Sequence, residues 1–367
     1  MFKPDYDNSI VNLSNSILKR FHVEPLHNSI PEIDTLLEKK KYVAVFLFDG
    51  MGQFIINTHL KDDGSFRQNV FTTITSTFPP TTVAATSAFL SAQYPIESGW
   101  IGWVQYIKEV DANVKVFKNY NTVTKETMPR PLLLEKISPF MNIIQRINEI
   151  NAKEVAHFYQ CKPLDDSFSS KYMSLFIKKA YKNVRKEDEG FVYAYWNTPD
   201  KMLHEYGVSH PKCRRNVKKI ERLITRYAKK NPDVLTIVIA DHGFHDVTYI
   251  SLDDYPDLKD CMIRPFSLEG RACNFFIKED KKAEFEGLFN KYLGDKFELF
   301  SKEKYIGNGL FGKNVPNEVV NNFLGDFVAV AIGDYSLENK TSSFHLKAHH
   351  AGGTKEEMLI DVVVLNK

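Results

Sequence analysis

Three continuous apolar runs constrain the fold of this chain more than any other feature. They read YVAVFLF, GFVYAYW and VLTIVIA, and they cover residues 42–48, 190–196 and 234–240. Runs of this length without polar alternation are typical of parallel strands that are buried on both faces. Segments with helical patterns separate the three runs. We therefore predict an α/β fold in which a central, mostly parallel sheet is flanked by helices on both faces.

Helical patterns fill the gaps between these strands. Pro80 precedes a run of small residues, which predicts a helix that begins near Thr82. Further helices are predicted over residues 9–20, 132–151 and 212–230, and the last of them has one charged and one apolar face. We expect these helices to cover the sheet.

A different pattern fills residues 261–321, with a strand-like ACNFFIK, an amphipathic helix, a short FELF strand and a glycine-rich turn. This pattern predicts a small α+β insertion or cap subdomain that would shape the choice of substrate. Residues 1–260 and 322–367 would form the core. The apolar runs DFVAVAIG and MLIDVVVL would supply two more strands to that core.

Composition and charge exclude several classes of protein. Lys and Arg total 48 and Asp and Glu total 46, so the formal net charge is +2 and nucleic acid is not expected as the main partner. No stretch approaches the roughly 20 apolar residues of a membrane span, and the start of the chain is too polar for a secretory signal. We therefore expect a cytoplasmic protein with no membrane partner. The four cysteines lie far apart, which argues against a disulfide framework or a zinc knuckle.

Residues able to bind metal ions follow all three apolar runs: Asp49 after the first, Asp200 and His204 after the second, and Asp241 and His242 after the third. The active sites of open α/β sheets lie at the carboxyl ends of strands, so these side chains are candidates for one site. Asp200 and His204 are spaced i, i+4 and would reach one cation from a helix. Plainer interpretations exist for single residues, such as an Asp-Gly turn at Asp49 or a helix N-cap at Asp200.

Two further segments complete the candidate set. Thr82 opens the predicted helix, where unpaired backbone N–H groups and the helix dipole form an anion site, so its hydroxyl is a candidate nucleophile. The plainer interpretation is that Thr81 or Thr82 caps the helix. His349 and His350 precede two glycines, and only one of the two imidazoles needs to be a ligand.

The ligand types indicate the chemistry. Three carboxylates and three imidazoles make two sites of three ligands each, and this mixture of oxygen and nitrogen fits Zn²⁺ or Mn²⁺. A pair of such ions about 4 Å apart can clamp both oxygens of an in-line displacement at phosphorus. Thr82 would complete the coordination of one ion, which would lower the pKa of its hydroxyl and activate it as a nucleophile.

Five stretches occur along the chain in one order: VAVFLFDGMG, FPPTTVAATSAFLSAQYPIESGWIGW, YWNTPDKMLHEYG, IVIADHGF and HHAGGTKEEMLIDVVV. Together they resemble the alkaline phosphatase superfamily and, within it, the nucleotide pyrophosphatase/phosphodiesterase branch. The resemblance implies that Thr82 is the nucleophile and the fourth ligand of one metal ion. It also implies two ligand triads, the first formed by Asp49, Asp241 and His242 and the second by Asp200, His204 and His350.

The resemblance also decides between neighbouring residues. It favours Thr82 over Thr81 by the spacing to the following Tyr-Pro pair, and His350 over His349 by the stretch TKEEM that follows. One departure stands at Ala85, where the eukaryotic phosphodiesterases of this branch carry an asparagine close to the phosphoryl oxygens. Backbone N–H groups, the two metal ions or a neighbouring threonine would then take over its task.

The activity that these features imply is hydrolysis of phosphodiester or nucleotide pyrophosphate bonds through a phospho-threonine intermediate. The expected cofactors are two divalent metal ions, Zn²⁺ or alternatively Mn²⁺, and the expected substrate is a small phosphoester such as a nucleotide. Alternatives within the superfamily are a phosphomonoesterase, a phosphonate hydrolase or a phosphomutase. Outside it, the remaining alternative is a metal-binding protein that has lost catalysis.

Overall fold

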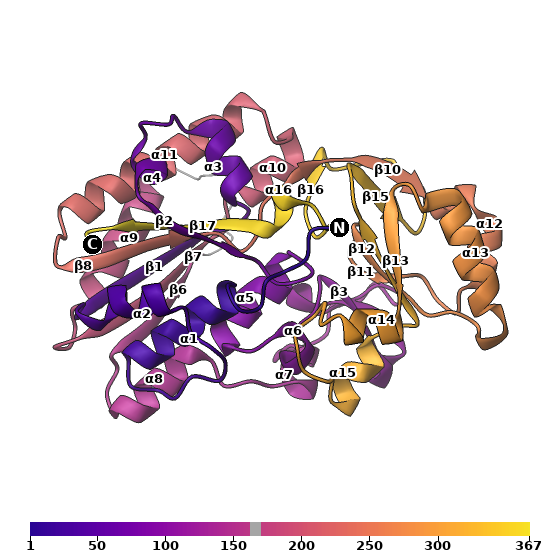
Figure 1. Ribbon diagram of the computed structural model, residues 1–367, viewed down its shortest axis with the longest axis horizontal. Coiled ribbons are helices and arrows are strands. Elements are labelled where there is room, and N and C mark those ends of the chain that lie inside the picture. The colour runs from indigo at the N-terminus through magenta and orange to yellow at the C-terminus, as the bar shows by residue number, and fades with distance from the viewer. Residues whose placement is uncertain (162–169) are drawn as a thin grey trace.

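The computed structural model of the protein describes residues 1–161 and 170–367, and a six-stranded sheet lies at its centre (Figure 1). Four neighbouring strands of this sheet are parallel, and one strand runs antiparallel to both of its neighbours. The predicted mostly parallel α/β sheet is therefore confirmed. In spatial order the strands are β2 (Val70–Thr75), β17 (Leu359–Leu365), β8 (Val234–Ile239), β1 (Tyr42–Phe48), β7 (Gly190–Trp196) and β6 (Ala156–Gln160).

Helices cover both faces of the central sheet. Figure 1 shows α1 (Ile10–Arg20), α2 (Pro31–Glu38), α5 (Thr82–Ser91) and α8 (Ile143–Asn151) on one side, and α3 (Gln53–His59), α4 (Ser65–Gln68) and α11 (Pro211–Lys229) on the other. The helices predicted over 9–20 and 212–230 and near Thr82 are thus confirmed. Further helices are α6 (Pro95–Ser98), α7 (Leu133–Ile137), α9 (Ser170–Asn183), α10 (Asp200–Tyr206) and α16 (Lys355–Met358).

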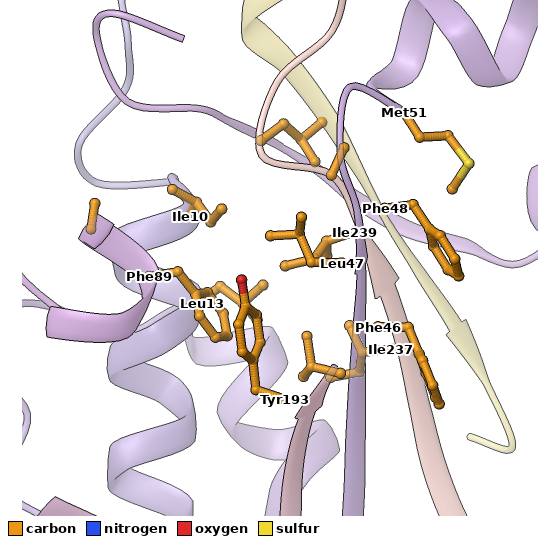
Figure 2. Packing of buried hydrophobic residues seen from close by; sticks show 14 of the residues in the cluster. Ile10, Leu13, Phe46, Leu47, Phe48, Met51, Phe89, Tyr193, Ile237 and Ile239 are labelled. Carbon is orange, nitrogen blue, oxygen red and sulfur yellow. The ribbon is translucent and has the colours of Figure 1, made fainter. Parts of the chain in front are cut away.

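Strand β1 shows why its sequence is apolar at every position. Phe46 and Phe48 point to one side of the strand, and Leu47 points to the other side, toward Leu13 and Phe89 on the covering helices (Figure 2). All five side chains are buried. Since each fully buried side chain of this kind contributes about 1.5–3 kcal/mol, the two helical layers hold the sheet from both faces.

The helix predicted over residues 132–151 is wrong as a single element. The chain forms two helices there, α7 and α8, and Pro139 lies in the break between them. Proline has no backbone N–H and its ring collides with the preceding turn, so it interrupts a helix even where the apolar pattern continues.

A second, seven-stranded sheet is antiparallel throughout. It takes strands from before, within and after the predicted insertion at 261–321. In spatial order they are β13 (Phe297–Ser301), β14 (Phe327–Ala331), β12 (Ala272–Phe275), β11 (Ser267–Leu268), β3 (Val104–Ile107), β4 (Ala112–Lys115) and β5 (Tyr120–Asn121).

The apolar run at β14, which was predicted as a strand of the core, belongs to the second sheet and not to the central one. Val328 and Val330 pack into the main core, whereas Phe327 and Ala329 pack into a second apolar cluster. That cluster lies against α12 (Pro256–Cys261) and α13 (Lys282–Leu293), which stand at the far end of the molecule in Figure 1. A continuous apolar run reports burial on both faces of a strand, and it does not identify the sheet to which the strand belongs.

Short elements complete the described part of the chain. The pair β10 (Thr248–Ser251) and β15 (Tyr335–Glu338) is parallel, and the pair β9 (His245–Asp246) and β16 (Ala348–His349) is antiparallel. Two further helices are α14 (Lys302–Gly307) and α15 (Glu318–Phe323). No helix in the described ranges has the length and apolar character needed to span a membrane. The four cysteines are free and buried.

A fully buried ion pair joins the two sheets. Arg271, in the turn between β11 and β12, donates through Nε and Nη2 to the two carboxylate oxygens of Glu357 in α16, at 2.7 and 2.8 Å. Its remaining hydrogen bonds reach the carbonyl oxygens of Tyr335 and Gly333. Burial raises the pKa of Glu357, but the Arg271 guanidinium outweighs it and leaves the pKa below its ordinary value. The pair therefore fixes the second sheet to the segment that leads into β17.

Replacing Arg271 by glutamine should lower the free energy of unfolding by about 3–5 kcal/mol, because Glu357 would remain buried without a cation. Chemical denaturation followed by circular dichroism measures this change. The control is Lys282→Gln, which removes ion pairs at the surface with Glu279 and Asp326 and should have a much smaller effect. Equal losses in the two variants would contradict the role assigned to the buried pair.

Candidate metal centre and active site

The central sheet brings three carboxylates together at its carboxyl edge. Strands β1, β7 and β8 end at the same level, because Phe48 pairs with Trp196 and Leu47 pairs with Ile239. Backbone hydrogen bonds then tie the following turns to each other, from Asp49 N to the Trp196 carbonyl and from Asp200 N to the Asp49 carbonyl, both at 2.9 Å. The residues that follow the three strand ends, Asp49, Asp200 and Asp241, therefore face one region.

Thr82 lies at the first position of α5 and faces this region. Its hydroxyl donates to Asp49 Oδ1 over 3.3 Å, and its Oγ1 lies 3.2 Å from His242 Nε2. The Tyr195 hydroxyl donates to the other oxygen of Asp49. One carboxylate thus bridges a threonine and a tyrosine, which fixes the position of the threonine hydroxyl.

Thr81 is placed differently from its neighbour. Its side chain is fully buried, and its hydroxyl donates to Glu269 Oε1 over 2.7 Å. It is the N-cap residue of α5, yet neither its hydroxyl nor that of Thr82 makes a side-chain capping hydrogen bond. The geometry therefore supports Thr82 as the candidate nucleophile and removes helix capping as the role of the two hydroxyls.

Three histidines share one arrangement, in which Nδ1 faces a backbone carbonyl oxygen. A carbonyl oxygen can only accept, so Nδ1 carries the proton and Nε2 keeps its lone pair for a metal ion. Each Nε2 lies within 3.8 Å of an aspartate oxygen. The Nδ1 partners are the carbonyl oxygens of Ala348 for His204 at 2.8 Å, Gly243 for His242 at 3.0 Å and Pro80 for His350 at 3.2 Å.

The electrostatics of the cluster disfavour its ionised form. Burial raises the pKa of Asp241 to about 6, and burial together with neighbouring carboxylates raises the pKa values of Asp49 and Asp200 well above the ordinary range. Burial likewise lowers the pKa of His204 to about 4 and that of His350 well below its usual value. Neutral imidazoles and mutually repelling carboxylates are what a divalent cation would stabilise.

The residues fit metal ions by their geometry as well as by their chemistry. Asp200 Oδ1 and Asp241 Oδ2 are buried and make no hydrogen bond within the described residues. Two groups of three residues are close enough to hold a cation, because the three ligand atoms within each group all lie within 4.8 Å of one another. Asp200 belongs to both groups. The first group, Asp200, His204 and His350, equals one predicted triad. The second group, Asp49, Asp200 and His242, differs from the other predicted triad, because it contains Asp200 where Asp241 was predicted.

All seven residues predicted from the sequence therefore meet in one site. Strand β8 ends at Ile239, so Asp241 and His242 both lie in the turn that follows it. Their side chains approach each other, with Asp241 Oδ2 at 3.5 Å from His242 Nε2. His349 contacts His204 through its ring and directs Nδ1 to the His350 carbonyl.

Sequence reasoning missed two residues of the site, Tyr195 and Glu269. Tyr195 lies inside an apolar run that reads as core, although the alternation of a strand places it on the same face as Tyr193. Glu269 lies in the segment predicted as an insertion, and no local pattern connects it to Thr81. Only the pairing of β11 with β3, which the sequence does not indicate, brings it to the site.

A cavity of about 560 Å³ opens beside the candidate nucleophile. Thr82, Thr86 and Ser87 of α5 contribute to its wall, and Thr86 donates its hydroxyl to the Thr82 carbonyl over 2.6 Å. Ala85 is fully buried and does not line this cavity. The aromatic part of the lining consists of Trp100, Phe117, Phe140, Phe158, Tyr193 and Tyr195.

The predicted cap segment contributes nothing to this lining among the described residues. Apart from the hydroxyl residues of α5, the polar part of the wall comes from residues between α5 and β7: Arg130, Glu135, Asn142, Gln145 and Gln160. The cap was expected to shape the choice of substrate, but it reaches the site through Glu269 and not through this cavity.

Comparisons with known proteins agree with the geometry. A family model described as type I phosphodiesterase / nucleotide pyrophosphatase matches residues 43–353. No curated protein sequence matches the chain. The murine ectonucleotide pyrophosphatase/phosphodiesterase 5 has a similar structure, with a TM-score of 0.65, 16% identity and coverage of 88% of both chains.

Two related structures give the same picture of the fold. An inactive threonine-to-alanine variant of the murine protein, in complex with AMP, has a TM-score of 0.65 and 17% identity, and covers 89% of this chain and 88% of its own. The human protein of the same name has a TM-score of 0.65 and 16% identity, with coverage of 88% and 87%.

In metal-free protein, the free energy of unfolding should fall as the pH rises from about 4 through about 6. The folded pKa of Asp241 is about 6 and its ordinary value is 3.8, so between these values the folded state binds more protons than the unfolded state and stability declines. Denaturation of protein treated with a chelator, at a series of pH values, measures the slope.

Saturating Zn²⁺ or Mn²⁺ should abolish this decline, because the cation stabilises the ionised carboxylates. Asp241→Asn removes one titrating group and should make the slope shallower. An unchanged slope in that variant would refute the assignment of the decline to this carboxylate.

Proposed function

Because the chain belongs to the type I phosphodiesterase / nucleotide pyrophosphatase family and is therefore a hydrolase, we propose that it cleaves phosphodiester or nucleotide pyrophosphate bonds with two divalent metal ions and a phospho-threonine intermediate. The observation that carries the proposal is the position of Thr82. Its hydroxyl lies within hydrogen-bond distance of both Asp49 and His242, at the edge of a substrate-sized cavity.

The start of α5 supports the same proposal. The backbone N–H groups of Thr82, Val83 and Ala84 find no acceptor among residues 1–161 and 170–367. Free N–H groups at the positive end of a helix dipole stabilise an anion, so they suit the oxygens of a phosphoryl group beside the Thr82 hydroxyl.

The metal ions would be held by the two triads, with Asp49, Asp241 and His242 in one and Asp200, His204 and His350 in the other. When bound, two divalent cations supply positive charge that lowers the pKa of a nearby hydroxyl and polarises the phosphoryl oxygens. Oxygen and imidazole ligands of this kind fit Zn²⁺ or Mn²⁺. The position of Asp200 in both groups of ligand atoms supports two ions that lie close together.

The reaction that we propose has two displacements at phosphorus. Thr82 Oγ1 forms a bond to phosphorus, the bond to the leaving oxygen breaks, and the leaving group takes up a proton. Water then attacks the phospho-threonine, the bond between phosphorus and Oγ1 breaks, and the hydroxyl regains its proton. The Tyr195 hydroxyl holds one oxygen of Asp49, so that the other stays directed at Thr82 in both steps.

A nucleotide-like substrate is supported by the cavity and by one comparison. Trp100 packs against Phe117 and Phe140 at ring separations of 5.9 Å, and all three rings line the cavity. Flat aromatic surfaces of this kind stack with nucleobases. The murine relative was solved in complex with AMP, which supports the same class of ligand here.

Thr82→Ala should lower kcat for a bis(nitrophenyl) phosphodiester by roughly 10⁴-fold or more, because it removes the nucleophile. Metal content should stay at about two ions per chain, since three protein ligands of each ion remain. Thr82→Ser is the matched control, because it keeps a hydroxyl and should retain activity. Substantial turnover by the alanine variant would refute the nucleophile assignment.

Phe140→Ala should weaken binding of a nucleoside substrate through the loss of one aromatic wall. We expect KM for a thymidine 5′-nitrophenyl phosphodiester to rise about 10-fold, whereas KM for the methyl nitrophenyl phosphodiester should hardly change. The two substrates share a leaving group, so the comparison isolates the nucleoside. Ile150→Ala, at an exposed position of α8, should alter neither value. Equal effects on both substrates would mean that the cavity does not hold the nucleoside.

A further inference from the structure

Glu269 is a buried carboxylate that the proposed reaction leaves without a task. Its side chain is 7% exposed, and burial raises its pKa to about 7. One oxygen, Oε1, accepts two hydrogen bonds, from the Thr81 hydroxyl at 2.7 Å and from Trp103 N at 2.9 Å. Two hydrogen bonds to one oxygen compensate the burial of a carboxylate only in part.

Thr81 stands in the backbone conformation of a capping residue. Its φ and ψ are −140° and 150°, the extended geometry that places a threonine hydroxyl within reach of the second or third N–H of the helix. Only rotation of the side chain separates the observed hydrogen bond to Glu269 from a cap on α5. The N–H groups that such a cap would occupy are those of Val83 and Ala84, which have no partner in the described residues.

The turn that carries Glu269 is held in a strained and crowded conformation. Leu268 has a φ of +69°, which costs free energy for any residue with a side chain. A Cβ atom at Gly102 would lie 2.9 and 3.1 Å from atoms of Leu268, so the two segments approach more closely than side chains permit. The carboxylate of Glu269 therefore reaches Thr81 from a turn whose backbone conformation is locally strained.

Asp241 gives an independent sign that a ligand belongs at this place. Its side chain is 0% exposed, and its Oδ2 makes no hydrogen bond within the described part of the chain. The same oxygen lies 3.5 Å from His242 Nε2, which in turn lies 3.2 Å from the Thr82 hydroxyl. Thr82, the first residue of α5, therefore contacts a polar cluster in which one buried carboxylate oxygen lacks a partner among the described residues.

We propose that Glu269 is a positioning residue for phosphoryl transfer, which holds the Thr81 hydroxyl away from α5 and so keeps the first N–H groups of the helix free for the phosphoryl oxygens. This inference rests on the proposed function, because it assigns a binding partner to those N–H groups. In this arrangement the second sheet acts on the nucleophile through one hydrogen bond. Without Glu269, the Thr81 hydroxyl turns to cap the helix and competes with the substrate.

Glu269→Ala tests the first part of the proposal. We expect kcat to fall about 10- to 100-fold, because donors to the developing charge are lost. The affinity for inorganic phosphate, measured by calorimetry on metal-loaded protein, should fall in parallel. Glu269→Gln keeps an acceptor oxygen for Thr81 and should lie close to the wild type in both measurements. An unchanged phosphate affinity in Glu269→Ala would overturn the proposal.

The double variant Thr81→Ala, Glu269→Ala separates positioning from a merely structural role. Removing the competing hydroxyl should restore phosphate affinity and kcat by about 10-fold relative to Glu269→Ala, although the double variant has fewer hydrogen bonds. If Glu269 only holds the second sheet against α5, the double variant should recover neither phosphate affinity nor kcat. This outcome would also overturn the proposal. If Glu269→Ala does not fold, Glu269→Met fills a similar volume without a hydrogen-bond acceptor. It then replaces Glu269→Ala in both the single and the double variant.

Failure of this inference is distinguishable from failure of the proposed function. Phosphodiester turnover by Thr82→Ala would refute the nucleophile, whatever the Glu269 variants do. An inactive Thr82→Ala combined with unaffected Glu269 variants would refute only the positioning role. Phosphate affinity can also be compared between Thr82→Ala and the double variant Thr82→Ala, Glu269→Ala. This measurement tests the positioning role in protein that does not turn over substrate.

Discussion

The constraint on which the rest of this structure depends is the burial of three carboxylates at the ends of adjacent strands. Within the described residues, Asp49, Asp200 and Asp241 have histidines and no lysine or arginine as their ion-pair partners. Holding these carboxylates together out of water costs free energy, which the apolar layers on both faces of the sheet must offset. The three imidazoles whose Nδ1 faces a backbone carbonyl oxygen do not offset this cost, because they are neutral. They offer lone pairs to a cation and add no positive charge of their own.

The sequence predicted this edge of the fold well, because the information there is local. Each of the three apolar runs ends beside its polar residue, and parallel strands of similar length bring their carboxyl ends to one level. The rest depended on contacts between distant segments. The run at 327–331 has the composition of a central strand but joins the second sheet, and Pro139 divides a helix whose apolar pattern continues through it. Glu269 and Tyr195 carry no pattern of their own, so only the fold identifies them.

The second sheet supports the site from one short turn. Glu269 and Arg271 are two residues apart, and they reach two different parts of the site. Glu269 accepts a hydrogen bond from Thr81, the neighbour of Thr82, whereas Arg271 pairs with Glu357, which also accepts from Gly352 N near His350. A single turn thus contacts both the start of α5 at Thr81 and the loop that carries His350. A rigid turn suits the proposed function, because the Thr82 hydroxyl and the metal-binding side chains must keep their relative positions during the reaction.

The wide separation of the ligands along the chain has a consequence for biosynthesis. Asp49 leaves the ribosome first, whereas His350 follows after both sheets have been almost completely translated, so neither neighbouring strands nor early helices suffice to form the second triad. Closing contacts over such distances is slow, and a preformed site does not exist before they close. Under the proposed function, we therefore expect the second metal ion to bind only after the segment around His350 has joined the strand ends.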